Sequence, residues 1–120
     1  MPLYSVSLLF SLEVQGPGAP LPLQELAVHV VAAADEEEAE ARGQMIGKNR
    51  ETSYKNSRGE VVRDVFKAVV EVQHLIDDHL RYGMEVASWM FRKGEVLVID
   101  EGGIVCRAAA DGVRPAGSDP

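Results

Sequence analysis

The sequence predicts an α+β domain with a mostly antiparallel sheet and two helices packed on one face. Three observations lead to this class. Two long segments, 3–14 and 61–73, alternate apolar and polar residues with the period of a half-buried strand. Short turn motifs join most of the other extended segments, which favours antiparallel pairing. Two further segments, 35–47 and 75–82, have the composition of helices that interrupt the strands.

The strand predicted over residues 3–14 has the strongest pattern. Its even-numbered positions from Tyr4 to Val14 are all apolar, and serines and Glu13 occupy most of the odd-numbered ones. A Gly- and Pro-rich loop over 15–20 follows. Residues 23–33 then form a second strand, which is apolar on both faces toward its end and is therefore expected in a well-covered position.

The first predicted helix begins after Asp35, an N-cap residue, with Glu38 at the position where a capping box places an acid. A narrow stripe of small residues that includes Gly43 indicates close packing against the sheet. Gly47 is the expected end of the helix.

A hairpin is predicted next, with a short strand over 52–56, a turn at residues 56–59 and the long strand 61–73. Tyr54 is expected to pair with the start of the long strand. One face of the long strand is predicted to carry Val62, Phe66, Ala68, Val70 and Val72. The other face is predicted to carry Arg63, Lys67, Glu71 and Gln73, together with Val61, Val65 and Val69.

The last third of the chain is predicted to contain a helix over 75–82 that ends at Gly83. A strand over 85–92 follows, and two short strands, 96–99 and 104–107, are joined by a turn. The strand order cannot be deduced from these patterns.

The length predicts one domain over residues 1–112, followed by a flexible tail over 113–120. Cys106 is the single cysteine, the N-terminus lacks a secretory pattern, and no apolar run is long enough to span a membrane. We therefore expect a cytoplasmic protein. The net charge of −7 argues against binding to nucleic acid and to phosphate backbones, and it allows a basic protein partner. Solubility alone also accounts for an acidic surface.

Five stretches of the sequence carry a resemblance to a known family: 4–10, 35–41, 54–63, 66–75 and 83–88. Together they resemble, over residues 4–91, the small bacterial family catalogued as domain of unknown function 4288. The resemblance implies a bacterial cytoplasmic protein of similar size. It brings no established activity and therefore no catalytic residue. Residues 96–107 look like an addition beyond the family's usual end.

The histidines are the candidate metal ligands. On the helix predicted over 75–82, His74 and Asp78 are four residues apart and would share a face, with His79 adjacent. A zinc site needs three or four ligands, so another, such as His29, would have to join them. A polar helix surface is the favoured interpretation, and no metal or other cofactor is predicted.

Cys106 is a candidate nucleophile only if a histidine lies close to it. It lies in a predicted strand, without a helix N-terminus to lower its thiol pKa. A buried structural thiol is the favoured interpretation.

A polar strand face forms the candidate binding site, made up of Tyr54, Arg58, Arg63, Lys67 and Glu71. These side chains would line a cleft if they converged. A row of cross-strand ion pairs in solvent explains the same pattern and is favoured.

A candidate partner surface consists of the acidic residues Glu36, Glu37 and Glu40, which would attract a basic protein. A solvated helix start explains them equally simply. The favoured function is a non-enzymatic protein-interaction module, an inhibitor or immunity-like protein. The alternative is a small ligand-binding domain or enzyme around Tyr54, Arg63 and Glu71. The edge strands also permit a homodimer, and Met90 would mark a dimer or partner interface if it faced outward on an edge strand.

Overall fold

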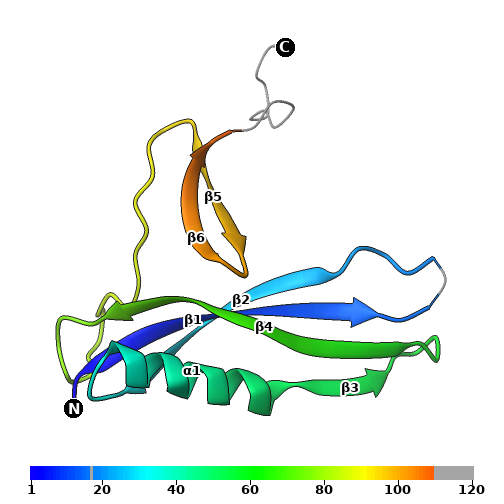
Figure 1. The fold of residues 1–120 in the computed structure, drawn as a ribbon, viewed down its shortest axis with the longest axis horizontal. Coiled ribbons are helices and arrows are strands. Elements are labelled where there is room, and N and C mark those ends of the chain that lie inside the picture. The colour runs from blue at the N-terminus through cyan, green and yellow to red at the C-terminus, as the bar shows by residue number, and fades with distance from the viewer. Residues whose placement is uncertain (17, 110–120) are drawn as a thin grey trace.

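The computed structural model describes residues 1–16 and 18–109. Its main body is a four-stranded antiparallel sheet with a helix on one face, and a separate two-stranded hairpin stands off the other face (Figure 1). The main sheet contains β1 (Leu3–Val14), β2 (Leu23–Ala32), β3 (Thr52–Lys55) and β4 (Val61–His74), in the order β2-β1-β4-β3. The helix is α1 (Glu36–Arg50), and the hairpin pairs β5 (Glu95–Asp100) with β6 (Gly103–Ala108).

The predicted class is therefore confirmed in its main feature, the antiparallel sheet with helical cover on one face. The described residues contain one α-helix where two were predicted. The predicted domain end at residue 112 and the predicted tail over 113–120 lie outside the described residues.

β1 is the central strand, and it pairs with β2 on one side and with β4 on the other. Its even-numbered residues face α1, as the alternation predicted, and Val6, Leu8 and Phe10 are almost fully buried in the core. The serines on its opposite face are also buried: Ser5 and Ser7 are each 1% exposed. The polar face of this strand is therefore buried as well, which the sequence did not predict.

β4 contains two register shifts against β1, one between Ser7 and Leu8 and one between Leu9 and Phe10. Each shift skips one residue of β4, namely Val70 and Lys67. Because a β-bulge reverses the side-chain alternation beyond it, the prediction that Ala68 and Val70 share the face of Phe66 is wrong. Val69, predicted on the other face, packs toward α1 instead.

α1 begins where it was predicted to begin. The Asp35 carboxylate accepts a hydrogen bond from the Glu38 backbone N–H at 2.8 Å, as an N-cap does. The Glu38 side chain bonds to Arg42.

The predicted end of α1 at Gly47 is wrong, since the helix continues to Arg50. Gly43 and Gly47 instead allow close packing on the sheet. A Cβ on Gly43 would lie 2.5 Å from Val6 Cγ1, and one on Gly47 would lie 2.4 Å from Phe66 Cδ1. The glycines are therefore required by helix–sheet contact.

Residues 75–82 form bends and turns, so the helix predicted there is wrong. Leu75 is buried, but Ile76 is 99% exposed and Leu80 is 64% exposed. The segment therefore has no continuous apolar stripe to bury against the sheet, and packing against the sheet is what stabilises a short helix.

Residues 84–109, which we call the arm, run away from the sheet and return as the β5–β6 hairpin (Figure 1). The strand predicted over 85–92 is wrong because no other strand pairs with these described residues. The predicted strands 96–99 and 104–107 are confirmed as β5 and β6. Two hydrogen bonds between the Gln73 side chain and the Ser88 main chain hold the start of the arm.

Candidate functional site

The predicted binding set does not converge as a whole. Arg63 lies opposite Glu13 of β1, on the sheet face away from α1. Tyr54 lies opposite Val62, the residue before Arg63, so the Tyr54 side chain points to the α1 face. Arg58 lies in the β3–β4 turn. The structure therefore separates Tyr54 from the charged residues with which it was predicted to form a cleft.

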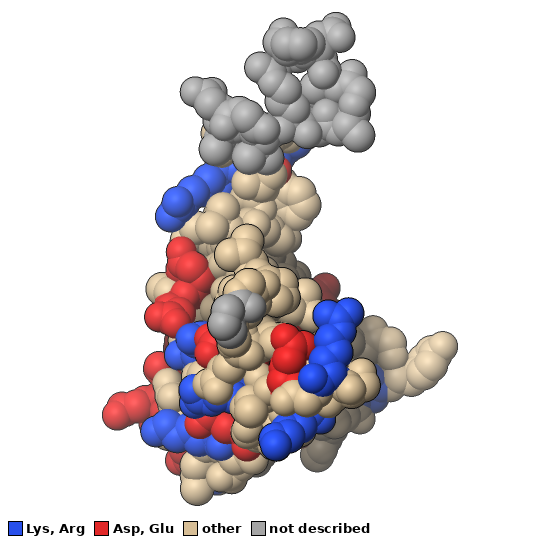
Figure 2. All heavy atoms as spheres, turned by 90° about the vertical axis from the view of Figure 1, so that its right-hand side faces the viewer, with Lys and Arg blue, Asp and Glu red and all other residues tan. Residues whose placement is uncertain are grey.

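The Lys67 ammonium forms an ion pair with the Glu13 carboxylate at 3.2 Å. Figure 2 faces the end of the sheet where β1 ends and β4 begins. Basic and acidic side chains are mixed there, and neither sign of charge dominates this surface. Lys67 of the predicted binding set therefore forms a cross-strand ion pair, as the favoured interpretation of these charged residues expected.

The histidines do not come together. The His74 ring stacks on Tyr4, with ring centroids 4.9 Å apart, and His79 pairs with the neighbouring Asp78 at 3.4 Å. Since residues 75–82 are not helical, the helical face that would unite His74 and Asp78 does not form. Among the described residues, no group of three or more His, Cys, Asp or Glu side chains is arranged to hold a metal ion.

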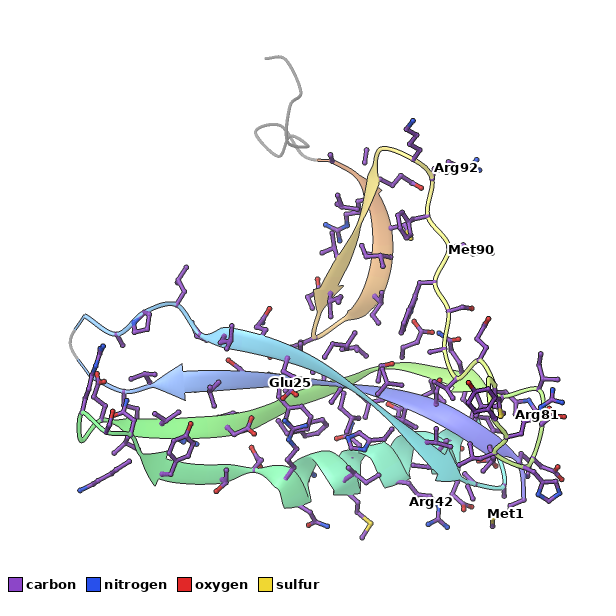
Figure 3. All side chains as sticks on the ribbon, turned by 180° about the vertical axis from the view of Figure 1, so that it is seen from behind. Met1, Glu25, Arg42, Arg81, Met90 and Arg92 are labelled. Atoms are coloured by element: carbon purple, nitrogen blue, oxygen red, sulfur yellow. The ribbon has the colours of Figure 1, made fainter. Side chains whose placement is uncertain are left out.

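Cys106 is exposed, so the prediction of a buried thiol is wrong. Its sulfur lies 2.9 Å from the Met90 carbonyl oxygen across the arm. Met90 is 90% exposed, and Figure 3 shows it with Arg92 on the arm, clear of the main sheet. Met90 faces outward, but residues 85–92 form no strand, so the condition under which the sequence indicated an interface, an outward Met90 on an edge strand, is not met.

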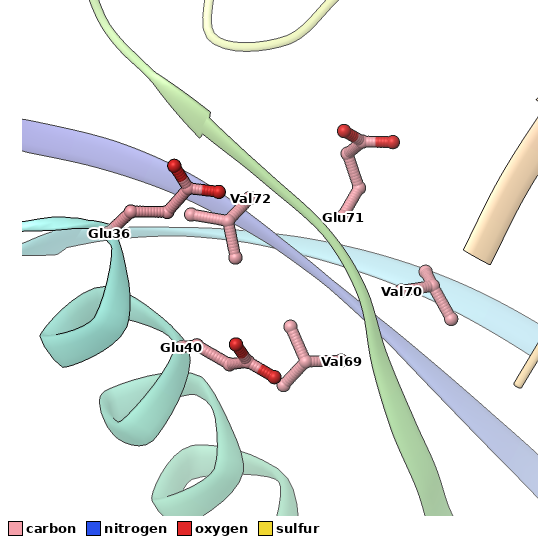
Figure 4. Close-up of a pocket in the computed structure, with 6 residues that line it drawn as sticks. All are labelled: Glu36, Glu40, Val69, Val70, Glu71 and Val72. Atoms are coloured by element: carbon pink, nitrogen blue, oxygen red, sulfur yellow. The ribbon is translucent and has the colours of Figure 1, made fainter. Parts of the chain in front are cut away.

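A shallow pocket, which we call the acidic groove, lies between the first turns of α1 and the outer part of β4. Its volume is about 220 Å³, and its lining consists of Glu36, Glu40, Val69, Val70, Glu71 and Val72. Figure 4 shows Val69 pointing toward α1, whereas Val70 and Glu71 point away from it. The groove thus unites two of the predicted acidic surface residues with one residue of the predicted strand face; Glu37 does not line it.

The main chain of β4 beside the acidic groove is an unpaired strand edge. β3 pairs only with residues 61–64 of β4. No other strand of the described chain pairs with residues 65–74 on this side. This edge was not predictable because it depends on the strand order and on the shortness of β3.

Two hydrogen bonds show which groups of β4 face this edge. The Leu3 carbonyl accepts from the Leu75 N–H at 2.9 Å, which directs the main chain of Leu75, and by alternation that of Gln73, toward β1. Val72 therefore presents its N–H and C=O outward. Farther along, the outward N–H of Phe66 donates to the Glu51 carboxylate at 3.1 Å. Part of the edge is thus capped by a side chain, and the part inside the groove is open.

The charge of the acidic groove is one-sided. Three Glu residues line it, with the carboxylates of Glu36 and Glu40 on the α1 side and that of Glu71 on the opposite face of β4, and within the described residues its lining contains no Lys or Arg. The nearby Arg42 is bound to Glu38, one turn along α1. Such a groove favours cationic groups, and its open main chain offers hydrogen bonds to an extended peptide.

The serine side chains under the other sheet face are a feature that the sequence reasoning missed. The hydroxyl oxygens of Ser5 and Ser7 are buried and have no hydrogen-bond partner within the described residues. The alternation of residues 3–14 located these serines on one face but gave no signal that this face would be covered.

A family model described as Domain of unknown function (DUF4288) matches residues 3–88. The match covers more than half of the chain, so the fold just described is that of a member of this family. The chain belongs to the DUF4288 family, and the resemblance found in the sequence is confirmed. The matched residues include the main sheet, α1 and the acidic groove, whereas β5 and β6 lie beyond them.

No curated protein and no solved structure matches the chain significantly. In the described part of the chain, no helix is both long enough and apolar enough to cross a membrane.

Proposed function

We propose that this protein is a non-enzymatic protein-interaction module that binds an extended, basic segment of a partner in the acidic groove. The segment would add as a strand to the open edge of β4, next to α1. A protein that masks a basic partner in this way would act as an inhibitor or an immunity-like protein. The observation that carries the proposal is the coincidence of an unpaired strand edge with a groove whose lining contains three Glu residues, two of them on α1, and no Lys or Arg among the described residues.

The open main chain supplies the affinity in this proposal. Strand addition to a sheet edge is a recurring mode of peptide recognition, in which main-chain hydrogen bonds bind the peptide and neighbouring pockets select its side chains. Here Val72 presents its N–H and C=O, and the start of α1 forms one wall of the groove.

The carboxylates supply the selectivity. Glu36 and Glu40 are one turn apart on α1, whereas the Glu71 side chain lies on the opposite face of β4. Alternate residues of a bound strand point to the same side, so lysine or arginine at every second position would meet Glu36 and Glu40 on the α1 side, and the residues between them would lie on the side of Glu71. The exposure of Glu36 and Glu40 makes the attraction modest and sensitive to salt.

Binding can be tested with fluorescent peptides of alternating lysine and valine, and with matched peptides that carry glutamate or serine in place of lysine. We expect anisotropy to detect the lysine peptide alone, with affinity that falls as salt rises. Replacing Glu36, Glu40 and Glu71 together by glutamine should weaken binding about tenfold, which corresponds to about 1.4 kcal/mol. A triple Gln variant at Glu85, Glu95 and Glu101, outside the groove, is the matched control and should bind like the wild type.

A second variant tests the strand edge independently of charge. Val72→Pro removes the outward N–H and should abolish binding, whereas Val72→Thr retains the N–H and should bind normally. If the serine and glutamate peptides bind as tightly as the lysine peptide, or if Val72→Pro has no effect, the proposal is wrong. Circular dichroism establishes that each variant is folded.

A further inference from the structure

β2 forms the other outer edge of the main sheet, at the opposite end of the strand order from β3. It is ten residues long and pairs with β1 in a continuous register without a bulge. Its sequence contains no Lys, Arg or Pro. Bulges, prolines and lysines are the features by which edge strands avoid pairing with another chain. β2 therefore lacks these three protections, and its one acidic side chain, Glu25, is paired with Arg50 of α1.

The main-chain groups that face this free edge can be identified from two hydrogen bonds. The Pro2 carbonyl accepts from the Ala33 N–H at 3.1 Å, so the even-numbered residues of β1 face β2. Their partners in the register are the odd-numbered residues of β2, such as Ala27 opposite Leu8. The even-numbered residues of β2, including Leu26 and Val28, thus direct their N–H and C=O groups away from the sheet.

We propose that this edge of β2 binds the same edge of a second copy of the chain. The two strands would run antiparallel about a two-fold axis at Ala27, and the two main sheets would join into one. Ala27 would face Ala27 of the second copy, so one of the smallest side chains of the strand lies at the two-fold axis. Leu26 would face Val28 of the second copy in a hydrogen-bonded pair on the side away from α1.

The polar residues Glu25 and His29 of β2 support this register. With Ala27 on the axis, Glu25 faces His29 of the second copy, and both side chains lie on the α1 side of the sheet. The His29 Nε2 atom is buried and has no hydrogen-bond partner among the described residues. Opposed acid and imidazole groups favour this register over neighbouring ones, in which Glu25 would face an apolar residue.

An apolar groove beside β2 provides the second argument for a second copy. Its volume is about 410 Å³, and it is lined by Val31, Ala32, Arg42, Met45, Ile46 and Asn49. In the proposed register, Leu23 of the second copy faces Val31 on the α1 side and reaches this groove. Leu23 is 69% exposed in the single chain, and Met45 is 67% exposed. The pairing therefore buries two strongly exposed apolar side chains, Leu23 and Met45, together.

The proposed dimer leaves both acidic grooves free, because they lie at the far edges of the joined sheet. The inference therefore does not depend on the proposed function, and the two can fail separately.

The first test is the mass of the protein in solution, measured by light scattering after size exclusion at high micromolar concentration. We expect a species of twice 13.0 kDa for the wild type. Val28→Pro removes an outward N–H that does not bond to β1 and should yield the monomer, whereas Val28→Thr retains the N–H and should remain a dimer. A monomeric wild type, or a Val28→Pro variant that folds and remains a dimer, would overturn the proposal.

The second test measures the register and does not rely on the proline variant. Facing residues of a non-hydrogen-bonded antiparallel pair have Cα atoms about 4.5 Å apart, within the range of a disulfide. In a Cys106→Ser background, Ala27→Cys should therefore cross-link two chains on mild oxidation. Glu25→Cys in the same background should not cross-link, because its facing residue is His29. Cross-linking by Glu25→Cys alone, or by neither variant, would contradict the register at Ala27.

Discussion

The two outer edges of the main sheet differ in length, protection and charge. The β2 edge is a continuous strand of ten residues without Lys or Arg, and it borders an apolar groove. The β4 edge is closed at one end by β3 and at Phe66 by Glu51, and its open part borders the carboxylates of Glu36 and Glu40. The sheet therefore offers a self-complementary edge on one side and an edge suited to a basic strand on the other.

α1 is the element that both edges share. Its first turns carry Glu36 and Glu40 of the acidic groove, and its later turns carry Met45 and Ile46 of the apolar groove. The difference between the two edges therefore depends on the position of one helix across the sheet. Variants that move or loosen α1 should alter both edges at once, whereas variants of one edge should leave the other unchanged.

The largest expected effect is a loss of stability when a large side chain is removed from the core between α1 and the sheet, since both edges depend on the packing of α1. Phe10 is 1% exposed, packs on Phe66 with ring centroids 5.7 Å apart, and lies under the Arg50 guanidinium. Phe10→Ala should lower the free energy of unfolding by about 3–5 kcal/mol, measured by urea denaturation. Phe91→Ala, at a 57% exposed position of the arm, is the control and should change stability little. An equal fall in the free energy of unfolding of both variants would contradict the packing of Phe10 in the core and the exposure of Phe91 on the arm.

A smaller effect is expected when α1 is pushed away from the sheet. Gly43→Val places side-chain atoms where Val6 Cγ1 already lies, so stability should fall by about 1–3 kcal/mol. Ala41→Val on the exposed side of α1 introduces the same side chain and should cost about 0.5 kcal/mol. Thermal unfolding of the pair checks the difference. If the two variants are equally stable, α1 does not pack on the sheet through Gly43.

The smallest effect concerns the connection between the two edges. The Arg50 guanidinium lies 4.1 Å from the centre of the Phe10 ring and pairs with Glu25 of β2 and Asp64 of β4. Because Arg50 is about one-third exposed, salt weakens these pairs, and Arg50→Met should cost about 1–2 kcal/mol. Arg42→Met, which removes an exposed pair within α1, should cost less than about 0.5 kcal/mol. Urea denaturation at low and high salt measures the free energy of unfolding of both variants. The difference between them should become smaller at high salt, and an unchanged difference would contradict the ionic contribution of Arg50.

The sequence predicted the main sheet well because its long strands have one face buried against α1. The period-two pattern of residues 3–14 and 61–73 records that burial directly, and Asp35 has the hydrogen-bonding chemistry that a helix start requires. The bulges at Lys67 and Val70 were not predictable, because both faces of β4 are apolar in this region and a one-residue shift leaves the pattern almost unchanged.

The segments that were wrongly predicted are those with little or no tertiary packing. Residues 85–92 alternate in polarity as a strand does and are extended, but the pattern cannot supply a pairing partner. Residues 75–82 have polar helix formers but no buried stripe. The residues of the acidic groove were predicted but its location was not. Glu36, Glu40 and Glu71 were candidates from the sequence. Their position beside an open strand edge depends on the strand order, which local patterns do not contain.

The central claim is that the open edge of β4 in the acidic groove binds an extended basic peptide. Amide-resolved NMR titration of the labelled protein with the alternating lysine–valine peptide tests it most directly. We predict chemical-shift changes at residues 69–72 and 36–40, with the amides of β2 unaffected. Changes confined to β2 or to the arm, or equal changes with the glutamate peptide, would contradict the claim.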